Sequence, residues 1–262
     1  MLLTIDIGNT NTVIGVYDGD TLVDHLRIES RRSATEDEYG ALVMTLLERR
    51  GVGAERVLDA IIGSVVPPLT EVFATLCRRW LTVDPVIVGP GVKTGMPILY
   101  ENPREVGADR IVNAIAAYAR AQRETVVVDF GTATTFDVIS AKGEYLGGVI
   151  VPGIGISADA LFARAAKLPR VEVARPERVI GRTTTTAMQS GLVFGYVGLV
   201  EGLVERIAGE LGSRPHVIAT GGLAPLIASE TTAIDAIDPN LTLDGLRMVW
   251  LRNREGGRTS AA

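Results

Sequence analysis

Short apolar runs separated by small polar turns open the chain and predict a β-hairpin. Residues 2–5 read as a strand, residues 6–12 (Asp-Ile-Gly-Asn-Thr-Asn-Thr) supply a polar turn that contains glycine, and residues 13–17 are apolar again. Asp18 and Gly19 then signal the next turn. The first segment therefore predicts two paired strands joined by a turn rich in hydroxyl groups.

The same order of residues recurs from position 126 and predicts an internal repeat. Residues 126–128 are a second apolar strand, residues 129–135 (Asp-Phe-Gly-Thr-Ala-Thr-Thr) a second turn, and residues 136–139 a second return strand. Any two hairpins share some features, but the shared order of strand, Asp-x-Gly, hydroxyl-rich turn and strand favours duplication. Aligned without a gap, the equivalent pairs are Asp6 with Asp129, Gly8 with Gly131, and Thr12 with Thr135.

A second, weaker similarity between the two halves follows each hairpin. Residues 57–64 read as a strand that leads through a small-residue turn to Pro68, and residues 217–222 do the same before Pro225. Strands followed by helices, in two similar halves, predict an α/β fold of two domains that face a cleft, residues 1–115 and 116–262. The polar, glycine-rich tail from Arg252 on is expected to be loose. Helical periodicity fills the intervals at residues 36–50, 111–123, 158–166 and 187–211.

Composition removes several classes of function. The chain has 262 residues and a formal net charge of −5, without a basic stripe, so nucleic acid is not an expected partner. Cys77 is the only cysteine, which excludes an intrachain disulfide, and two histidines make a His-rich metal site or a Ser-His-Asp triad improbable. The start lacks the features of a signal peptide and no uninterrupted apolar run predicts a membrane span, so we expect a cytoplasmic protein.

The two turns have the residues that phosphate binding requires. A glycine turn after a strand exposes backbone N–H groups, and Gly8 and Gly131 allow a close approach that a Cβ would block. Asp6 and Asp129 end their strands at these turns, where a carboxylate suits a hydrated metal ion that bridges phosphates. Further donors are the hydroxyl groups of Thr10, Thr12, Thr132, Thr134 and Thr135. One such turn is weak evidence, whereas two such turns and a Thr-Gly-Gly turn at 220–222 form a specific set.

Two other glycine segments imitate nucleotide motifs. Residues 91–94 (Gly-Val-Lys-Thr) lack the Gly-Lys adjacency and the upstream spacing of a P-loop. Residues 153–158 fit a loose dinucleotide fingerprint, with Glu172 near the distance expected for a ribose acid. Pro152 at the turn, and an internal repeat that a dinucleotide fold does not explain, favour a tight connection from strand to helix instead.

Asp109 has two readings that residue chemistry alone leaves open. It stands in the segment 107–110 (Gly-Ala-Asp-Arg) that opens a helix, where an acid interacts favourably with the macrodipole. A carboxylate there can equally accept the proton of an acceptor hydroxyl during phosphoryl transfer. The glycines at 191, 195, 198 and 202 also have two readings, because they recur at helical spacing. They favour close helix packing, either within the domain or at a subunit interface.

Eight segments, in order along the chain, resemble the motifs of type III pantothenate kinases, which belong to the superfamily of actin, sugar kinases and heat-shock ATPases. The resemblance covers the chain to about residue 246 and implies two actin-like (ribonuclease H-like) ATPase domains facing a nucleotide cleft. In that layout the first turn takes the γ-phosphate side, the second the β-phosphate side, and the Gly-Gly turn the nucleoside. The segments are residues 6–12, 100–103, 105–110, 129–135, 147–148, 152–153, 187–191 and 220–224.

The resemblance also implies residue roles. Asp109 is the catalytic proton acceptor, Asp6 handles magnesium through water, and Asp129 is a ligand for a monovalent cation such as K⁺ or NH₄⁺. Where Arg182 stands, the family usually has lysine. The implied ATP contacts are Asp6, Ile7, Gly8, Asn9, Thr10, Asn11, Thr12, Val13 and Thr132. The implied pantothenate contacts are Tyr100, Gly107, Ala108, Asp109, Arg110 and Thr184, the last within a run of four threonines.

The family implies phosphorylation of pantothenate by ATP with Mg²⁺, the first step towards coenzyme A, in a homodimer. Alternatives are a kinase of the same superfamily for a sugar or short acid, and a regulatory relative with weak catalysis. The Gly-Ala-Asp-Arg segment speaks against the first, and intact Asp6, Asp109 and Asp129 speak against the second. A binding module of the dinucleotide-fold type is a more distant alternative.

Overall fold

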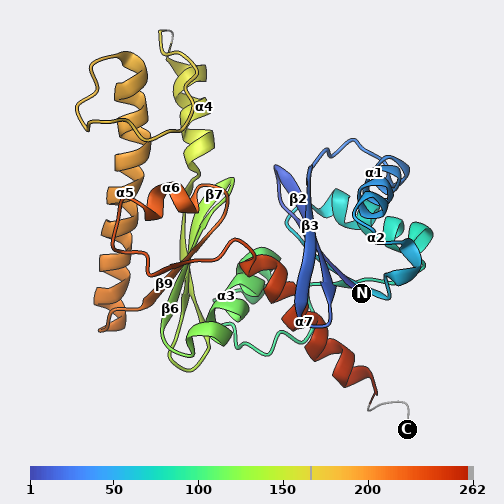
Figure 1. Cartoon of the computed structure of the whole chain (residues 1–262). Coiled ribbons are helices and arrows are strands. Elements are labelled where there is room, and N and C mark those ends of the chain that lie inside the picture. Colours follow the sequence, from blue (N-terminus) through green and yellow to red (C-terminus); the bar gives the residue numbers. More distant parts are fainter. Residues whose placement is uncertain (166, 259–262) are drawn as a thin grey trace. The chain divides into compact units, whose positions relative to one another are not determined.

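The computed structural model describes residues 1–165 and 167–258, and the chain forms two compact units (Figure 1). Unit 1 comprises Met1–Met96, Glu101–Ala116 and Leu241–Ala262, and unit 2 comprises Pro97–Tyr100 and Ala117–Asn240. The division at Ala116 lies next to the domain boundary that we expected at residues 115 and 116. A single boundary does not describe the units, however, because the C-terminal helix belongs to unit 1.

Unit 1 is built on a five-stranded mixed sheet of order β3-β2-β1-β4-β5. The first three strands form an antiparallel meander, whereas β4 and β5 run parallel to β1. Parallel pairing of β1 with β4 places their carboxyl ends at one edge of the sheet. The strands are β1 (Leu2–Ile7), β2 (Asn11–Asp18), β3 (Thr21–Glu29), β4 (Asp59–Ser64) and β5 (Val86–Ile87).

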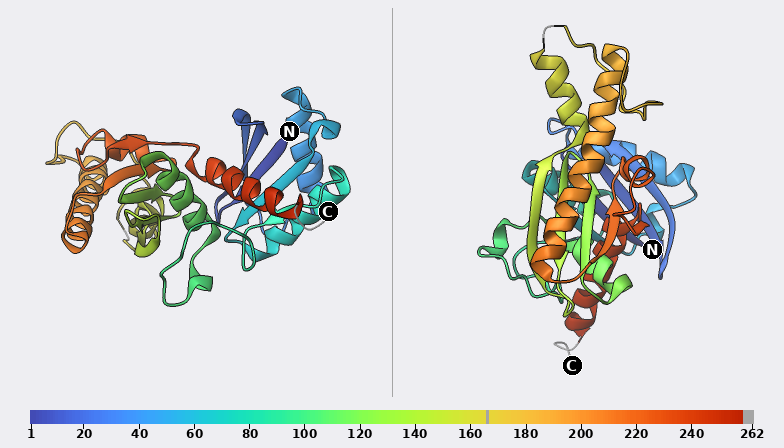
Figure 2. Two further views of the ribbon diagram at one scale, coloured as in Figure 1. Left: turned by 90° about the horizontal axis from the view of Figure 1, so that it is seen from below. Right: turned by 90° about the vertical axis from the view of Figure 1, so that its left-hand side faces the viewer.

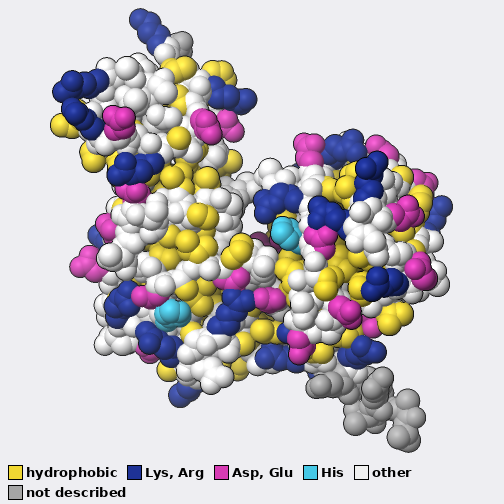
Figure 3. All heavy atoms as spheres, viewed as in Figure 1, with side chains coloured by type: hydrophobic (Ala, Val, Ile, Leu, Met, Phe, Trp, Pro, Cys, Tyr) yellow, Lys and Arg dark blue, Asp and Glu magenta, His cyan; other side chains and the backbone are white. Residues whose placement is uncertain are grey.

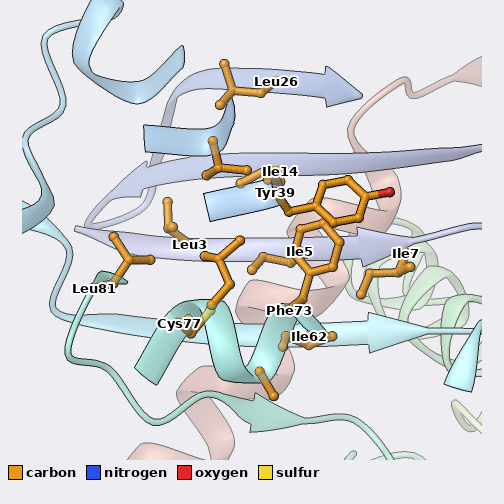
Figure 4. Packing of buried hydrophobic residues seen from close by; sticks show 14 of the residues in the cluster. Leu3, Ile5, Ile7, Ile14, Leu26, Tyr39, Ile62, Phe73, Cys77 and Leu81 are labelled. Carbon is orange, nitrogen blue, oxygen red and sulfur yellow. The ribbon is translucent and has the colours of Figure 1, made fainter. Parts of the chain in front are cut away.

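Helices α1 (Glu36–Arg49) and α2 (Pro67–Trp80) pack on one face of this sheet and close its hydrophobic core. Thr35 caps α1 with a capping box to Glu38, and Pro67 begins α2 where its missing N–H costs nothing. Figure 4 shows Tyr39 and Phe73 in contact above the strands, with ring centroids 4.7 Å apart. Cys77 is buried in this core, and burial raises the pKa of its thiol to about 12, so it is a packed and unreactive thiol, as expected.

Helix α7 (Leu241–Arg258) packs against β1 and β4 on the other face of the sheet. The sheet offers glycines there: a Cβ added at Gly15 would lie 3.0 Å from Leu243, and one at Gly63 would lie 2.9 Å from Leu246. Because α7 continues to Arg258, the segment 252–258 that we expected to be loose is helical. Residues 259–262 of the expected tail lie outside the described residues.

Unit 2 repeats this architecture with a sheet of order β10-β9-β6-β7-β8. Helix α5 supplies eight buried residues, and its valines form one cluster with β6, β7 and β9. Helix α4 contacts α5, and the two run side by side in Figure 2. The elements are β6 (Thr125–Phe130), β7 (Ala133–Ile139), β8 (Tyr145–Pro152), α4 (Ile154–Arg164), α5 (Thr184–Leu211), β9 (His216–Thr220), α6 (Ala224–Ala228) and β10 (Ala236–Ile237).

The internal repeat is confirmed, but the gap-free alignment of its turns is wrong by one residue. Ile7 pairs with Thr12 in unit 1, whereas Phe130 pairs with Thr134 in unit 2. The first turn closes with a hydrogen bond from Gly8 N to Asn11 O and the second from Gly131 N to Ala133 O, so the second turn is one residue shorter. Thr12 therefore corresponds to Thr134 and not to Thr135. The later strands keep this offset, because both units have a bulge at the same place, after Val16 and after Val138.

Several helices begin earlier than their periodicity predicted. Helix α3 (Ala108–Ala121) includes the Ala-Asp-Arg of the opening segment, and α5 begins at Thr184 because Thr183 and Thr186 form a capping box. Gly153 precedes α4 directly, and β8 is antiparallel to β7. The segment therefore is a tight strand-to-helix connection and not a dinucleotide βαβ unit. Two short 3₁₀ helices complete the described elements, η1 (Ala54–Arg56) and η2 (Pro103–Glu105).

Among the described helices, α5 is the one whose length and composition would allow it to cross a membrane. That criterion is also met by core helices, and α5 buries one face on the sheet of unit 2. Its glycines do not pack against another helix of the described chain. A Cβ added at Gly191, Gly195 or Gly198 would meet no heavy atom within 4 Å, which contradicts the reading of close helix packing within the domain.

Candidate active site

The first turn of unit 1 exposes backbone at the carboxyl end of β1. Gly8 has ordinary backbone geometry, because it is not among the glycines with positive φ, so its role there is to leave space and not to adopt a left-handed conformation. Asn9 and Thr10 are exposed at the tip. Ser30 N donates to Thr10 O at 3.0 Å, which ties the tip to the end of β3. The turn thus presents Asn9 and Thr10 to solvent, and Gly8 is half-buried beneath them.

Not every predicted ATP contact can use its side chain. Ile7 is fully buried in the core of unit 1, and Thr12 is fully buried with its hydroxyl 2.9 Å from the Ser30 hydroxyl. Asp6, Asn11 and Val13 are half-buried around the turn. Ile7 and Thr12 can therefore approach a ligand only through their backbone.

Arg32 adds a cation to this turn that our reading of the sequence missed. Its Nη2 donates to Asn9 Oδ1 at 3.0 Å. A guanidinium can bind phosphate oxygens with two parallel hydrogen bonds, so its place beside the turn suits an anionic ligand. The residue lies in a loop that follows β3, and no motif in the sequence distinguishes it from the neighbouring Arg31.

Asp109 lies at the same edge of the sheet as the first turn. A Cβ added at Gly107 would lie 2.5 Å from Asp109 Oδ1 and 3.4 Å from Val65 Cγ1, so the carboxylate folds back over Gly107 near Val65. Val65 N in turn donates to Ile7 O at 3.1 Å, at the end of β1. The parallel strands therefore bring together Asp6, the first turn and Asp109. Asp109 Oδ1 also accepts a hydrogen bond from Arg110 N at 2.8 Å.

Burial raises the pKa of Asp109 above its ordinary value of 3.8, although the Arg110 N–H and the Arg110 charge act in the opposite direction. An exposed acid at a helix start would have its pKa lowered by the macrodipole. Asp109 therefore differs from an exposed helix-start acid, and its role as a proton acceptor stays a prediction. The neighbouring residues predicted to contact pantothenate differ in exposure. Arg110 is buried, whereas Gly107 and Ala108 are half-buried.

The second turn holds the carboxylate of Asp129 between glycines. A Cβ added at Gly221 would lie 2.8 Å from Asp129 Oδ1 and 2.6 Å from Phe130 O, and one at Gly131 would lie 3.6 Å from Asp129 Oδ1. Gly221 has φ +91°, a conformation that requires glycine. Gly153 N donates to Thr132 O at 3.1 Å, which fixes the turn against the start of α4. The Thr-Gly-Gly segment and the second turn are therefore packed together in unit 2.

Of the five threonines expected to offer hydroxyls at the turns, two are exposed residues. Thr10 and Thr132 are exposed at the tips, whereas Thr12 and Thr134 are fully buried. Thr135 donates to Asp137 Oδ2 at 3.3 Å. Alternation along a strand explains the difference, because Thr12 and Thr134 are the strand partners of the buried residues Ile7 and Phe130.

The remaining predicted acceptor contacts lie in unit 2. Tyr100 is half-buried in the segment Pro97–Tyr100, and Thr184 is exposed at the first turn of α5. Thr183 and Thr186 use their hydroxyls in the helix cap, so Thr184 is better placed than either to contact a ligand. An open groove of about 590 Å³ adjoins it, lined by Leu161, Leu168, Thr184, Ala187, Met188, Gly191 and Leu192.

The carboxylates at the two turns are candidate metal ligands. In the part of the chain that the structure describes, no group of three or more His, Cys, Asp or Glu side chains gathers. Asp6 and Asp129 each place a carboxylate beside a turn of exposed backbone. That donor set fits a cation held jointly by one carboxylate, water and phosphate oxygens, which is the usual environment of nucleotide-bound Mg²⁺.

Comparison with solved structures identifies the fold. The chain matches a Baf family protein from Campylobacter jejuni with a TM-score of 0.62 and 19% identity, covering 97% of this chain and 99% of that one. It matches a protein from Sinorhizobium meliloti described as a 2-dehydro-3-deoxygalactonokinase with a TM-score of 0.57 and 13% identity, covering 96% of each chain. At such identities the likeness concerns the fold alone, the two-domain α/β fold of sugar kinases and actin-like ATPases.

Comparison of sequences identifies the family. The family model described as type III pantothenate kinase matches residues 2–206. The chain is 58% identical over 254 residues to a type III pantothenate kinase of Syntrophotalea carbinolica, which covers 97% of this chain and the whole of the relative. With the repeated turns, the Gly-Ala-Asp-Arg segment and the fold in agreement, the chain belongs to the type III pantothenate kinase family.

Proposed function

We propose that this protein transfers the γ-phosphoryl group of ATP to the primary hydroxyl of pantothenate, the first step of coenzyme A biosynthesis, in the cytoplasm. The observation that carries the assignment is the 58% identity, over almost the whole chain, to a type III pantothenate kinase. The arrangement of Asp109 beside the first turn supports it, because a proton acceptor and a phosphate-binding turn are the two parts that such a transfer needs.

The first turn is assigned to the nucleotide. Asp6, Ile7, Gly8, Asn9, Thr10, Asn11, Thr12 and Val13 would bind the ATP phosphates, Ile7 and Thr12 by backbone, and Thr132 would add a contact from the second turn. Mg²⁺ enters with ATP, and it would neutralise charge on the phosphates while Asp6 contacts it through water. Arg32 extends this set, since its guanidinium lies beside Asn9.

Asp109 is assigned to the acceptor. Its carboxylate would accept the proton as the pantothenate oxygen bonds to the γ-phosphorus and the bond from that phosphorus to the ADP oxygen breaks. Tyr100, Gly107, Ala108, Arg110 and Thr184 would bind the rest of pantothenate. Thr184 is favoured over its neighbours Thr183 and Thr186 because their hydroxyls close the helix cap.

Turnover with a panel of acceptors tests the assignment. The protein is supplied with ATP, Mg²⁺ and K⁺, and ADP production is measured with pantothenate, with several sugars and with short carboxylic acids. We expect pantothenate to be the one acceptor in the panel that supports ADP production. Phosphorylation of a sugar without phosphorylation of pantothenate would contradict the proposal and identify another kinase of the superfamily. No turnover with any acceptor would indicate a regulatory relative.

Replacing Asp109 with Asn should lower kcat by about 10²-fold or more, because the proton acceptor is lost while the shape is kept. The parent should lose activity as the pH falls through the raised pKa of Asp109, above the ordinary 3.8, because the carboxylate must be deprotonated to accept a proton. Steady-state kinetics over a range of pH measure both effects.

Asp37→Asn is the matched control for this variant. Asp37 is likewise an acid in the first turn of a helix, α1, where its charge contributes about 0.3–1 kcal/mol through the macrodipole. The Asp37→Asn variant should be slightly less stable than the parent and have the same kcat. If Asp109→Asn behaves like Asp37→Asn, Asp109 is a helix-start acid and has no part in the chemistry.

Asp129 is assigned to a monovalent cation beside the phosphates, K⁺ or NH₄⁺, where the ion would screen negative charge. Its carboxylate lies against Gly131 and Gly221, so backbone oxygens of the second turn are available beside it. Activity should be low in Na⁺ or Li⁺ buffers and recover in K⁺ or NH₄⁺, with Asp129→Asn insensitive to the exchange. Equal rates of the parent in all four salts would remove Asp129 from this role.

The glycine face of α5 is assigned to a homodimer interface. Gly191, Gly195 and Gly198 are exposed, and the nearby surface holds Leu161, Phe162 and Ile180, the last 82% exposed. Figure 3 shows hydrophobic side chains on the surface where α4 and α5 lie. Sedimentation should give twice the chain mass of 27.8 kDa, and Gly195→Arg should give the mass of one chain with the fold retained. A parent of single-chain mass would contradict the dimer.

A further inference from the structure

The backbone of the segment that carries Tyr100 is bonded to the sheet of unit 2 through Tyr145. Tyr145 N donates to Pro97 O and Leu99 N donates to Tyr145 O, both at 2.8 Å, and Ile98 forms a parallel bridge with Tyr145. Tyr145 thus uses both of its backbone groups to hold the residues that directly precede Tyr100. The position of Tyr145 in β8 therefore determines where the backbone of Tyr100 lies.

The side chain of Tyr145 is anchored in turn by a buried carboxylate. Tyr145 and Asp137 are both fully buried, and the Tyr145 hydroxyl donates to Asp137 Oδ1 at 2.7 Å. Thr135 donates to the other oxygen, Oδ2, at 3.3 Å. A hydrogen bond to a carboxylate away from water is strong, and either partner alone would be costly to bury. The pair therefore restricts how Tyr145 can move.

The ring of Tyr100 lies over Gly147, a glycine of β8, the strand that also contains Tyr145. Its centroid is 6.4 Å from that of Tyr145, with the planes tilted by 55°. A Cβ added at Gly147 would touch the Tyr100 ring at 3.7 Å, and Gly147 has φ +132°, which side chains other than glycine rarely adopt. The positive φ gives a physical reason for Gly147 in the Gly-Gly motif noted in the sequence.

The repeat indicates that the buried pair is not needed to build this kind of sheet. By the register of the strands, Asp137 corresponds to Gly15 and Tyr145 to Leu22, since Tyr17 pairs with Leu22 where Ile139 pairs with Tyr145. Unit 1 thus forms the same sheet with a glycine and a leucine at these positions. Burying a polar pair has a desolvation cost, so its presence in the unit that carries Tyr100 points to a local purpose.

We propose that Tyr145 and Asp137 are positioning residues for the acceptor: their buried hydrogen bond fixes β8 so that Tyr100 stands over Gly147 in the geometry that binds pantothenate. The inference rests on the proposed function, because it takes Tyr100 as a pantothenate contact. It assigns no chemical step to either residue. It predicts that they act on acceptor binding and not on nucleotide binding or turnover.

Tyr145→Phe tests the proposal, since it removes the hydroxyl and keeps the ring. The KM for pantothenate should rise about 3- to 10-fold, the effect of one lost hydrogen bond, while kcat and the KM for ATP stay within about 2-fold of the parent. Gly147→Ala should raise the same KM, because alanine rarely adopts φ +132° and the backbone beneath the Tyr100 ring must then shift. Hydrogen exchange of the Leu99 amide should be faster in Tyr145→Phe, whatever the substrate.

Tyr17→Phe is the matched control, because the Tyr17 ring is also fully buried and its hydroxyl donates to Asp244 Oδ1 at 2.5 Å, in unit 1. It should lower thermal stability in the same way and leave the KM for pantothenate unchanged. Equal KM values in Tyr145→Phe and Tyr17→Phe, or an unchanged Leu99 exchange rate, would overturn the inference. A parent that does not phosphorylate pantothenate would instead contradict the proposed function, and the Leu99 exchange rate would still decide whether Tyr145 anchors the segment.

Discussion

The parallel pairing of the first strand of each unit with the strand that follows its meander is the constraint on which the candidate site depends. It aligns Asp6 with Gly63 in unit 1 and Asp129 with Thr220 in unit 2. Carboxyl ends of parallel strands meet at one edge, so each carboxylate lies beside the small residues that follow the neighbouring parallel strand. In unit 1, Asp109 lies at this edge near Val65, which follows β4. In unit 2, Gly221 lies at the corresponding edge beside Asp129.

The repeat could be predicted from the sequence because hairpins are local. Asp6, Gly8, Asp129 and Gly131 were placed correctly at strand ends, since apolar alternation and glycine turns depend on near neighbours. The length of each turn could not be predicted. It is set by which carbonyl accepts the glycine N–H, Asn11 in one unit and Ala133 in the other, and no residue pattern records that choice.

Contacts that are distant in sequence were also beyond prediction. Helix α7 joins unit 1 because Gly15 and Gly63 leave room for Leu243 and Leu246, which lie about 180 residues or more further along the chain. Arg32 reaches Asn9 through a loop. Burial also distinguishes two carboxylates: Asp109 is half-buried beside a turn and has a raised pKa, whereas Asp137 is fully buried and bonded to Tyr145.

The most direct test of the account is nucleotide calorimetry of Gly8→Ala and Gly131→Ala, since both turns are assigned to phosphates. Neither glycine has a positive φ, and an added Cβ would lie 3.0 Å from Asn11 O or 3.4 Å from Ala133 O, so both variants should fold. Gly8→Ala should weaken ATP binding more than ADP binding, because its turn is assigned to the γ-phosphate. Gly131→Ala should weaken the binding of both nucleotides alike, because its turn is assigned to the β-phosphate. If either variant binds ATP as tightly as the parent, that turn is an ordinary hairpin and the account of two matched phosphate turns is wrong.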